Sequence, residues 1–349
     1  MNKILSLIIP TYNMEKYLDR CLASLICDAV ILSKLEVLVI NDGSTDGSSE
    51  IAHQYADKYP ETFVVVDKQN GHYGSCVNKG IELAKGKYVK VVDADDWINT
   101  TNLEGYLAYL ESSDADMFLT DTMTLNEYTN VKWVRSFVLK QNIIYEVSAL
   151  LDCIADDLAH QVITYKTSIL RGMNYRQSEG TPYTDLEWDI RPLAYVKTVM
   201  YYPHQLYCYL RGRENQSVSP AIHCRDMANE NRIVLGNAEY YEKVKNGLPE
   251  SNQSVMRKLE SANATRIYFH YLINFPKLLS NSDLAGFDNE LKSISPEVYA
   301  SVSGAKEVRK FMTFDYVSEW RKNKSRSTIR FRIFDLGISF GQVMRKMRH

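Results

Sequence analysis

The sequence lacks three features that would assign it to a special class of protein. Its six cysteines form no CxxC pair and no zinc-like spacing, and scattered thiols of this kind are typical of a reducing compartment. No apolar stretch approaches the ~18–20 residues that cross a bilayer. A formal net charge of −2 leaves no basic footprint for whole-chain nucleic-acid binding. These absences predict a cytoplasmic globular protein that does not bind nucleic acid.

The first hundred residues alternate between two kinds of apolar segment. Short β-branched runs bounded by turn residues predict strands buried on both faces, at Ile4–Ile9, Leu35–Ile40, Thr62–Val66 and Tyr88–Val92. Apolar residues at helical spacing lie between them, at Glu15–Leu25, Ser48–Lys58 and Tyr73–Ala84. The run Ile4–Ile9 is too short for a signal peptide and has no cleavage site after it. Strand and helix in alternation predict an α/β fold with a doubly wound, mainly parallel sheet.

The pattern changes along the rest of the chain. A helix at Asn102–Glu111 and a strand at Met117–Leu125 follow, and residues 126–220 mix strands, short helices and loops. From about residue 221 the pattern is helical, and we expect helices at Asp226–Val244, Ser251–Leu279 and Lys306–Lys322. We therefore predict a catalytic domain at 1–220 and a helical C-terminal region at 221–349.

Polar clusters end three of the predicted strands: Pro10–Asn13, Asn41–Gly47 and Asp93–Asp96. Each has an ordinary explanation, as a turn with a helix cap or as a solvated strand end. Together, however, they fall at the carboxyl edge of one sheet, where ligands of such folds bind. The carboxylates of Asp93, Asp95 and Asp96 also repel one another unless a cation or ligand hydroxyls compensate. The pattern therefore favours a ligand site with a divalent cation.

The three clusters, within residues 6–13, 39–46 and 86–97, resemble the family 2 glycosyltransferases of the GT-A fold. The resemblance is continuous over about residues 4–125, with weaker similarity to about 220. It implies that Thr11 and Tyr12 border the nucleotide base and that Asp42 hydrogen-bonds it, favouring uracil. It further implies that Asp93 faces the ribose and that Asp95 coordinates Mn²⁺ or Mg²⁺ at the diphosphate. The residues that it assigns to nucleotide-sugar binding are Pro10, Thr11, Tyr12, Asn13, Asp42, Gly71, Asn78, Asp93, Ala94, Asp95 and Arg213.

Two of these residues come from segments that match the family less closely. Residues 70–80 resemble its glycine-rich stretch beside the donor, but Val77 stands where the family often has arginine. Lys79 either substitutes for that arginine or is an exposed helix lysine. Residues 207–219 are similar to a segment that closes over the diphosphate, where Arg211 or Arg213 pairs either with phosphate or with a surface carboxylate.

A catalytic base is expected in the irregular middle of the chain. An inverting transfer needs a carboxylate within hydrogen-bond reach of the acceptor hydroxyl. Residues 179–188 resemble the family's acidic pair at a helix start, although Thr184 replaces its usual glutamate. We assign the base to Asp185, with Glu179 and Glu187 as alternatives. An aspartate favoured at a helix N-terminus by the helix dipole is the ordinary explanation of Asp185.

The end of the chain is basic. Residues 321–348 hold nine lysines and arginines and one acid, with apolar residues spaced by three and four at Ile333, Leu336, Phe340, Val343 and Met347. Such a helix either lies on an anionic membrane surface, here the inner face, or docks on the body or in a homodimer interface.

The resemblance implies an inverting transfer of one sugar from a UDP-sugar donor, a hexose or N-acetylhexosamine, to a glycan acceptor that is free, lipid-linked or protein-linked. The glutamine–arginine–tryptophan motif of processive synthases is absent, which favours one sugar per encounter. Two alternatives stay open. A degenerate nucleotide-sugar-binding scaffold is compatible with Val77 and Thr184. A nucleotidyltransferase also holds carboxylates and a metal near a strand end, but Pro10–Asn13 is neither glycine-rich nor basic.

Overall fold

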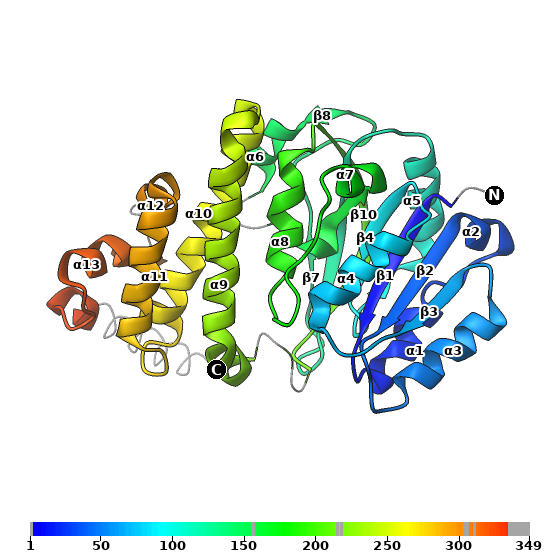
Figure 1. Ribbon diagram of the computed structural model, residues 1–349, viewed down its shortest axis with the longest axis horizontal. Coiled ribbons are helices and arrows are strands. Elements are labelled where there is room, and N and C mark those ends of the chain that lie inside the picture. Colours follow the sequence, from blue (N-terminus) through cyan, green and yellow to red (C-terminus); the bar gives the residue numbers. More distant parts are fainter. Residues whose placement is uncertain are drawn as a thin grey trace.

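The structure is a computed structural model, and it describes residues 3–154, 158–213, 216, 219–302, 307–309 and 312–333. A ten-stranded sheet with helices on both faces forms one side of the molecule, and a group of helices forms the other (Figure 1). The strands follow the order β3-β2-β1-β4-β9-β6-β10-β5, with β7 and β8 paired to β6 and β10. This order divides the sheet into a parallel half and a mixed half.

The parallel half consists of β1 (Leu5–Thr11), β2 (Leu35–Asn41), β3 (Phe63–Asp67) and β4 (Tyr88–Val91). Every residue of β1 and β2 is buried, as their apolar runs predict. Side chains alternate between two cores, with Leu7 in one and Ile8 in the other. All four predicted strands are therefore confirmed to within one or two residues at their ends.

Helices connect these strands and cover the sheet. They are α1 (Glu15–Ala23), α2 (Ala29–Lys34), α3 (Ser48–Lys58) and α4 (His72–Leu83). The short α2 was not predicted. It is held at its start by Asp28, whose carboxylate accepts hydrogen bonds from the backbone N–H groups of Val30 (2.9 Å) and Ile31 (3.0 Å).

The mixed half is built from segments far apart in the sequence. The antiparallel strand β9 (Ile163–Lys166) lies between β4 and β6 (Met117–Asn126), and β10 (Thr198–Arg211) runs parallel to β6. The short strands β5 (Trp97–Ile98), β7 (Lys132–Arg135) and β8 (Tyr145–Glu146) complete it. The helices associated with this half are α5 (Thr100–Glu111), α6 (Leu150–Cys153), α7 (Thr167–Gly172) and α8 (Asp185–Ile190).

The helical region begins with α9 (Pro220–Val244) and α10 (Glu250–Phe269), followed by α11 (Asn281–Ile294), α12 (Pro296–Val302) and α13 (Tyr316–Asn323). One apolar core runs from Ile8 of the sheet through Trp188 to Trp320 of α13. The helices are thus packed on the body, and a domain division at residue 220 stays a prediction. None of the helices in the described ranges is long and apolar enough to cross a bilayer.

Two predicted helices of this region are wrong in part. Instead of one helix at Lys306–Lys322, β11 (Glu307–Arg309) pairs antiparallel with β12 (Met312–Phe314) before α13. The helix begins only after Asp315, whose carboxylate accepts a hydrogen bond from the backbone N–H of Ser318 (2.9 Å). The helix predicted at Ser251–Leu279 is α-helical only as far as Phe269, and a π turn at His270–Asn274 follows it.

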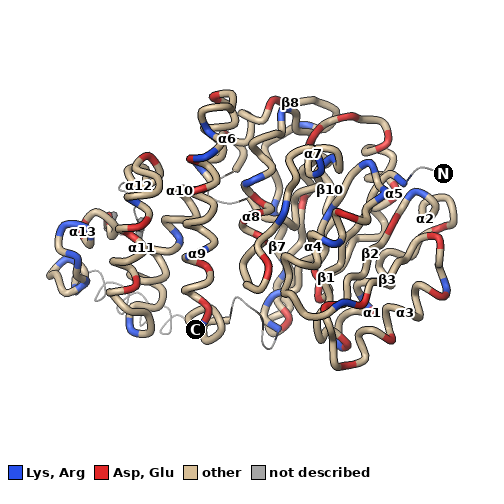
Figure 2. Tube along the Cα trace, viewed as in Figure 1, with Lys and Arg blue, Asp and Glu red and all other residues tan. Residues whose placement is uncertain are grey.

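The basic end of the chain falls largely outside the described residues. Figure 2 shows Lys and Arg positions, coloured blue, along α13 at the end of the molecule away from the sheet. Ile333 is exposed, but Leu336, Phe340, Val343 and Met347 lie in residues 334–349, which the structure does not describe. The membrane and docking alternatives for this segment therefore stay predictions.

Candidate active site

Asp42 lies at the carboxyl edge of the parallel half, directly after β2. Its side chain is 2% exposed, and one oxygen accepts hydrogen bonds from the Lys68 ammonium (2.6 Å) and the backbone N–H of Gly71 (2.9 Å). The backbone N–H of Asp42 donates to the carbonyl of Thr11 (2.8 Å). Three predicted donor residues from separate segments therefore meet here, with Lys68 as a fourth that the sequence analysis missed.

The loops after β1 and β2 are joined through Asn13. This residue has a positive φ of 52°, its N–H donates to the hydroxyl of Ser44 (3.0 Å), and its side-chain oxygen accepts from the N–H of Thr45 (2.8 Å). Pro10 and Thr11 are buried in β1, whereas Tyr12 is 48% exposed, and contacts of these residues with a nucleotide stay predictions. Asp46 has an ordinary structural role at the start of α3, where its carboxylate accepts hydrogen bonds from the N–H and the hydroxyl of Ser48. Asp42, whose partners are Lys68 and Gly71, stays the candidate for nucleotide binding.

The glycine-rich stretch is shaped by close packing. A Cβ on Gly71 would lie 2.7 Å from the Ser75 hydroxyl oxygen, so a larger residue there requires the Ser75 side chain to shift. Asn78 is buried, and its amide holds the loop before α8 by donating to the carbonyl of Gln177 (2.9 Å) and accepting from its N–H (2.8 Å). Val77 is part of the core, and Lys79 forms a surface pair with Glu82 (3.0 Å). Donor contacts by Gly71 and Asn78 stay predictions.

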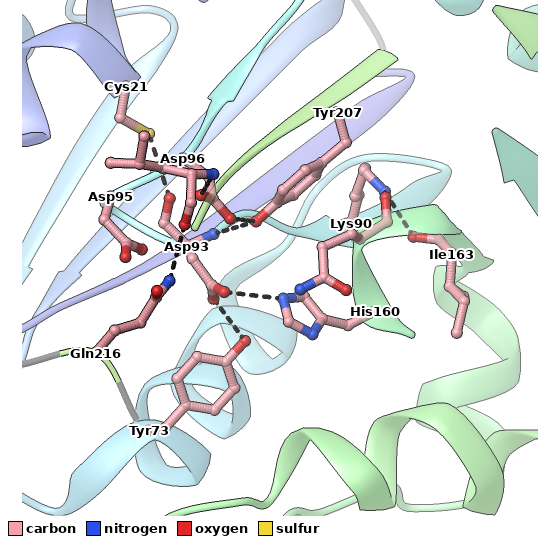
Figure 3. A network of polar contacts seen from close by, with 12 residues as sticks. Cys21, Tyr73, Lys90, Asp93, Asp95, Asp96, His160, Ile163, Tyr207 and Gln216 are labelled. Atoms are coloured by element: carbon pink, nitrogen blue, oxygen red, sulfur yellow. Dashed lines mark hydrogen bonds and ion pairs between the residues drawn. The ribbon is translucent and has the colours of Figure 1, made fainter. Parts of the chain in front are cut away.

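Asp93, Asp95 and Asp96 form an acidic cluster after β4 (Figure 3), with one oxygen from each residue within 4.8 Å of the others. Asp96 is fully buried and accepts hydrogen bonds from the Tyr207 hydroxyl (2.6 Å) and the backbone N–H of Leu210 (2.7 Å). It thereby fixes β10 against the cluster. The helix α5 is capped by Asn99 instead.

The Asp93 carboxylate is directed toward two side-chain partners, Tyr73 and His160. The Tyr73 hydroxyl donates to one oxygen (3.1 Å), and Nε2 of His160 lies 3.1 Å from the other (Figure 3). Burial acts to raise the pKa of Asp93, but the charge and hydrogen bond of His160, the hydrogen bond of Tyr73 and the charge of Arg213 together lower it below its usual value. Asp93 therefore stays ionised.

Asp95 pairs with the guanidinium of Arg213, and its backbone carbonyl accepts from Arg20 (2.6 Å). Burial and the nearby charge of Asp93 raise the pKa of Asp95 despite this ion pair. Gln216 holds the turn before Arg213 by accepting from the N–H of Gly212 (2.9 Å), a residue with φ of 95°. The neighbouring Ala94 is buried, and its contact with a donor stays a prediction.

His160 and Lys90 are site residues that the sequence analysis missed. Burial alone would lower the pKa of His160. The charges of Asp93 and Asp185 have the larger, opposite effect and raise the pKa to about 9. Lys90 is fully buried on β4, and its ammonium donates to the carbonyls of Gln161 (2.6 Å) and Ile163 (3.1 Å), next to His160. Burial lowers the pKa of Lys90 to about 7. A lysine inside an apolar strand was a signal for this contact, whereas nothing marked His160.

Asp185 is the first residue of α8, as predicted for a carboxylate at a helix start. Burial raises the pKa of Asp185, the charge of His160 lowers it and the charge of Asp93 raises it, so Asp185 lies near enough to both groups to feel their charges. The alternatives are engaged elsewhere. Glu187 is fully buried and bonded to Ser178 and Arg191, and Glu179 accepts from Asn78 (2.9 Å).

Part of the chain is similar to known glycosyltransferases. Residues 6–167 match the model of glycosyl transferase family 2. The minor teichoic acid biosynthesis protein GgaB of Bacillus subtilis is 35% identical over 106 residues, 30% of this chain and 12% of GgaB. The poly(ribitol-phosphate) beta-glucosyltransferase of Bacillus spizizenii is 34% identical over 117 residues, 33% of this chain and 18% of that protein. The chain thus matches less than a fifth of the length of either relative.

Solved structures of S. aureus TarS 1–349 share the fold. One crystal structure has a TM-score of 0.69 at 18% identity, covering 92% of this chain and 87% of that one. Another, in complex with UDP-GlcNAc, has a TM-score of 0.63 at 18% identity, covering 89% of this chain and 95% of that one. The predicted GT-A fold with a helical C-terminal region is confirmed by this likeness. The match to the model of glycosyl transferase family 2 spans residues 6–167, a little under half of the chain.

Proposed function

We propose that the chain moves a single sugar, with inversion, from a UDP-sugar to a carbohydrate acceptor in the assembly of a polysaccharide or glycoconjugate. The observation that carries this proposal is that Gly71 bonds to Asp42 and the nearby Tyr73 bonds to Asp93 of the acidic cluster, while Asp93 is near enough to Asp185 to raise its pKa. The UDP-GlcNAc complex of TarS, which has the same fold, supports a UDP-hexose or UDP-N-acetylhexosamine donor. The names of the relatives, which refer to teichoic acid biosynthesis and to poly(ribitol-phosphate), support a polymer acceptor.

The acidic cluster suits a divalent cation, Mn²⁺ or Mg²⁺. Its donors are carboxylate oxygens, which hard cations prefer, and burial with mutual repulsion raises the pKa of both Asp95 and Asp96. The oxygens of Asp96 are bonded to β10, whereas Asp95 pairs with an arginine that can exchange for other partners. We therefore assign metal binding to Asp95. A bound cation would supply charge neutralisation for the diphosphate leaving group.

Residues of the chain are assigned to each part of the donor nucleotide. Asp42, oriented by Lys68, accepts a hydrogen bond from the base, and Thr11 and Tyr12 border it. Asp93, held ionised by His160, accepts from the ribose hydroxyls. Arg213, released from Asp95, pairs with phosphate oxygens.

Asp185 is the general base of this proposal. In reach of the acceptor hydroxyl, its carboxylate takes the proton as the hydroxyl oxygen bonds to the sugar and the bond between the sugar and UDP breaks, releasing UDP. The raised pKa of Asp185 suits that task, because a stronger base removes the proton more readily.

A donor screen tests the proposal. Thermal shift would be measured with UDP-glucose, UDP-galactose, their N-acetyl forms and GDP- or dTDP-sugars, each with and without Mn²⁺. We expect a UDP-sugar to stabilise the chain in a metal-dependent manner and to be hydrolysed slowly to UDP. Stabilisation without turnover for any acceptor would favour the binding scaffold. Pyrophosphate released from a nucleoside triphosphate would identify a nucleotidyltransferase instead.

A further inference from the structure

A second cluster of ligand-type side chains lies in the helical region, away from the acidic cluster. It consists of His223 and Glu230 on α9 and His270 at the start of the π turn after α10. One ligand atom from each residue lies within 4.8 Å of the others. His223 and Glu230 are seven residues apart, which is two helical turns, so both face the same side of α9.

The three side chains contact one another directly. Nε2 of His223 lies 2.7 Å from one oxygen of Glu230, and the ring centroids of His223 and His270 are 4.3 Å apart. The other oxygen of Glu230 accepts from Nε of Arg266 (3.3 Å). Glu230 is 2% exposed and His270 is 8% exposed, so this polar group is almost removed from water.

His270 has a polar atom that nothing satisfies in the part of the chain that the structure describes. Its Nε2 is buried and has no hydrogen-bond partner. An unsatisfied buried polar atom costs about 1–3 kcal/mol, so each such atom needs an explanation. Burial lowers the pKa of His270 to about 4, which keeps the ring neutral at physiological pH, the form in which histidine ligates metals.

The backbone around His270 also departs from regular structure. The N–H of Phe275 donates to the carbonyl of His270 (2.8 Å), five residues back, which is the π-type bond. Single π turns within helices occur frequently at functional sites. The amide of Asn274 lies 3.2 Å from Nδ1 of His270 and can hold the ring by its oxygen once the amide is turned.

We propose that His223, Glu230 and His270 form a binding site for a divalent transition-metal ion of the zinc type, distinct from the acidic cluster. Two imidazoles and one carboxylate are a ligand set typical of such ions, and they leave a fourth position to water. The acidic cluster has only oxygen donors, so the two sites differ in preference. Arg266 holds the second oxygen of Glu230 in the manner of an outer hydrogen-bond partner.

The position of this site gives the ion a bracing role. It would join α9 to the end of α10, and the ring of Tyr183, two residues before Asp185, lies 5.7 Å from His223. The charge of Arg266, which bonds to Glu230, also lowers the pKa of Asp185. The ion would therefore stabilise the helical region against the loop that leads into α8.

Cobalt provides a direct test, because Co²⁺ bound by histidine and carboxylate at low coordination number absorbs visible light. The full chain without a histidine tag would be stripped of metal and titrated with Co²⁺, then with Zn²⁺ as a competitor. We expect one equivalent of Co²⁺ to give a visible band that Zn²⁺ abolishes, and Zn²⁺ to raise the melting temperature. No stoichiometric band in the wild-type chain would overturn the proposal, whatever the variants do.

Variants locate the site. His270→Gln should weaken Co²⁺ binding by more than about 100-fold, because loss of a ligand costs more than the roughly 10–100-fold loss of an outer partner. His204→Gln changes an exposed histidine outside the cluster and should bind as the wild type does. Asp95→Asn should also keep the band. A band that survives in folded His270→Gln, or disappears in Asp95→Asn, contradicts the assignment.

Discussion

The parallel and mixed halves of the sheet build the site in different ways. In the parallel half, Asp42, Asp93 and Asp95 lie within a few residues of strand ends, where β2 and β4 deliver them to one edge. In the mixed half, His160 and Arg213 come from segments whose neighbours in space are 67 and 118 residues away in the chain. Sequence motifs therefore reveal the residues on the donor side of the site, whereas the residues on the opposite side are brought together only by tertiary contacts.

The largest effect should come from the parallel half. Asp95→Ala removes the carboxylate assigned to the metal, and we expect it to abolish transfer and metal-dependent donor binding. Isothermal titration with UDP and Mn²⁺ and a transfer assay measure both. Asp57→Ala, at an exposed aspartate of α3, is the matched control. Turnover at the wild-type rate in Asp95→Ala would refute the metal assignment.

Asp185→Asn tests the other side of the comparison. We expect UDP binding to stay intact while transfer falls by roughly 10²–10⁴-fold, the range for loss of a general base. Since the pKa of Asp185 is raised, wild-type turnover should fall on acidification at a higher pH than an ordinary aspartate would give. The pH profile of kcat measures this. A mere twofold loss in Asp185→Asn would move the base elsewhere.

His160→Gln should change how stability depends on pH. The pKa of His160 is about 9 in the folded chain against 6.5 without its surroundings, so its pairing with Asp93 stabilises the fold fully below about pH 6.5. That contribution is lost as the pH rises through about 9. Urea unfolding should therefore show a gap between wild type and variant that closes at alkaline pH. His53→Gln, which changes an exposed histidine paired with Asp67, is the control, and an equal gap at every pH would contradict the account.

Gly74→Ala should have the smallest effect. Its Cβ would lie 2.0 Å from the carbonyl oxygen of Ser178, so the loop before α8 must shift. We expect a loss of about 1–3 kcal/mol in the free energy of unfolding, typical of overpacking, and a several-fold drop in turnover. At Gly172 a Cβ meets nothing within 4 Å, so Gly172→Ala should be nearly neutral. Equal effects of the two substitutions would argue against the packing explanation.

The sequence predicts the parallel half well because local signals and tertiary structure agree there. Strands buried on both faces need continuous apolar runs, and the polar residues that end them are adjacent in the chain. Asp185 could be found only through the family resemblance, and its helix start is confirmed. His160 could not be found, since a lone histidine in an irregular segment carries no period and no spacing.

The helical region was harder to predict for another reason. The helix expected at Lys306–Lys322 fails because an antiparallel strand pair and the cap at Asp315 interrupt the pattern. The cluster of His223, Glu230 and His270 was also invisible, because His270 lies 40 residues after Glu230 and meets it only through the packing of α10 on α9. Contacts of this kind can be identified only once the three-dimensional fold is known.

A crystal structure with UDP and Mn²⁺ tests the central claim most directly. The account predicts an ion coordinated by Asp95, with the Arg213 guanidinium moved from that carboxylate toward the diphosphate and the uracil beside Asp42. An edge of the sheet without ion or nucleotide, with Arg213 still paired to Asp95 at saturating UDP and Mn²⁺, would contradict it.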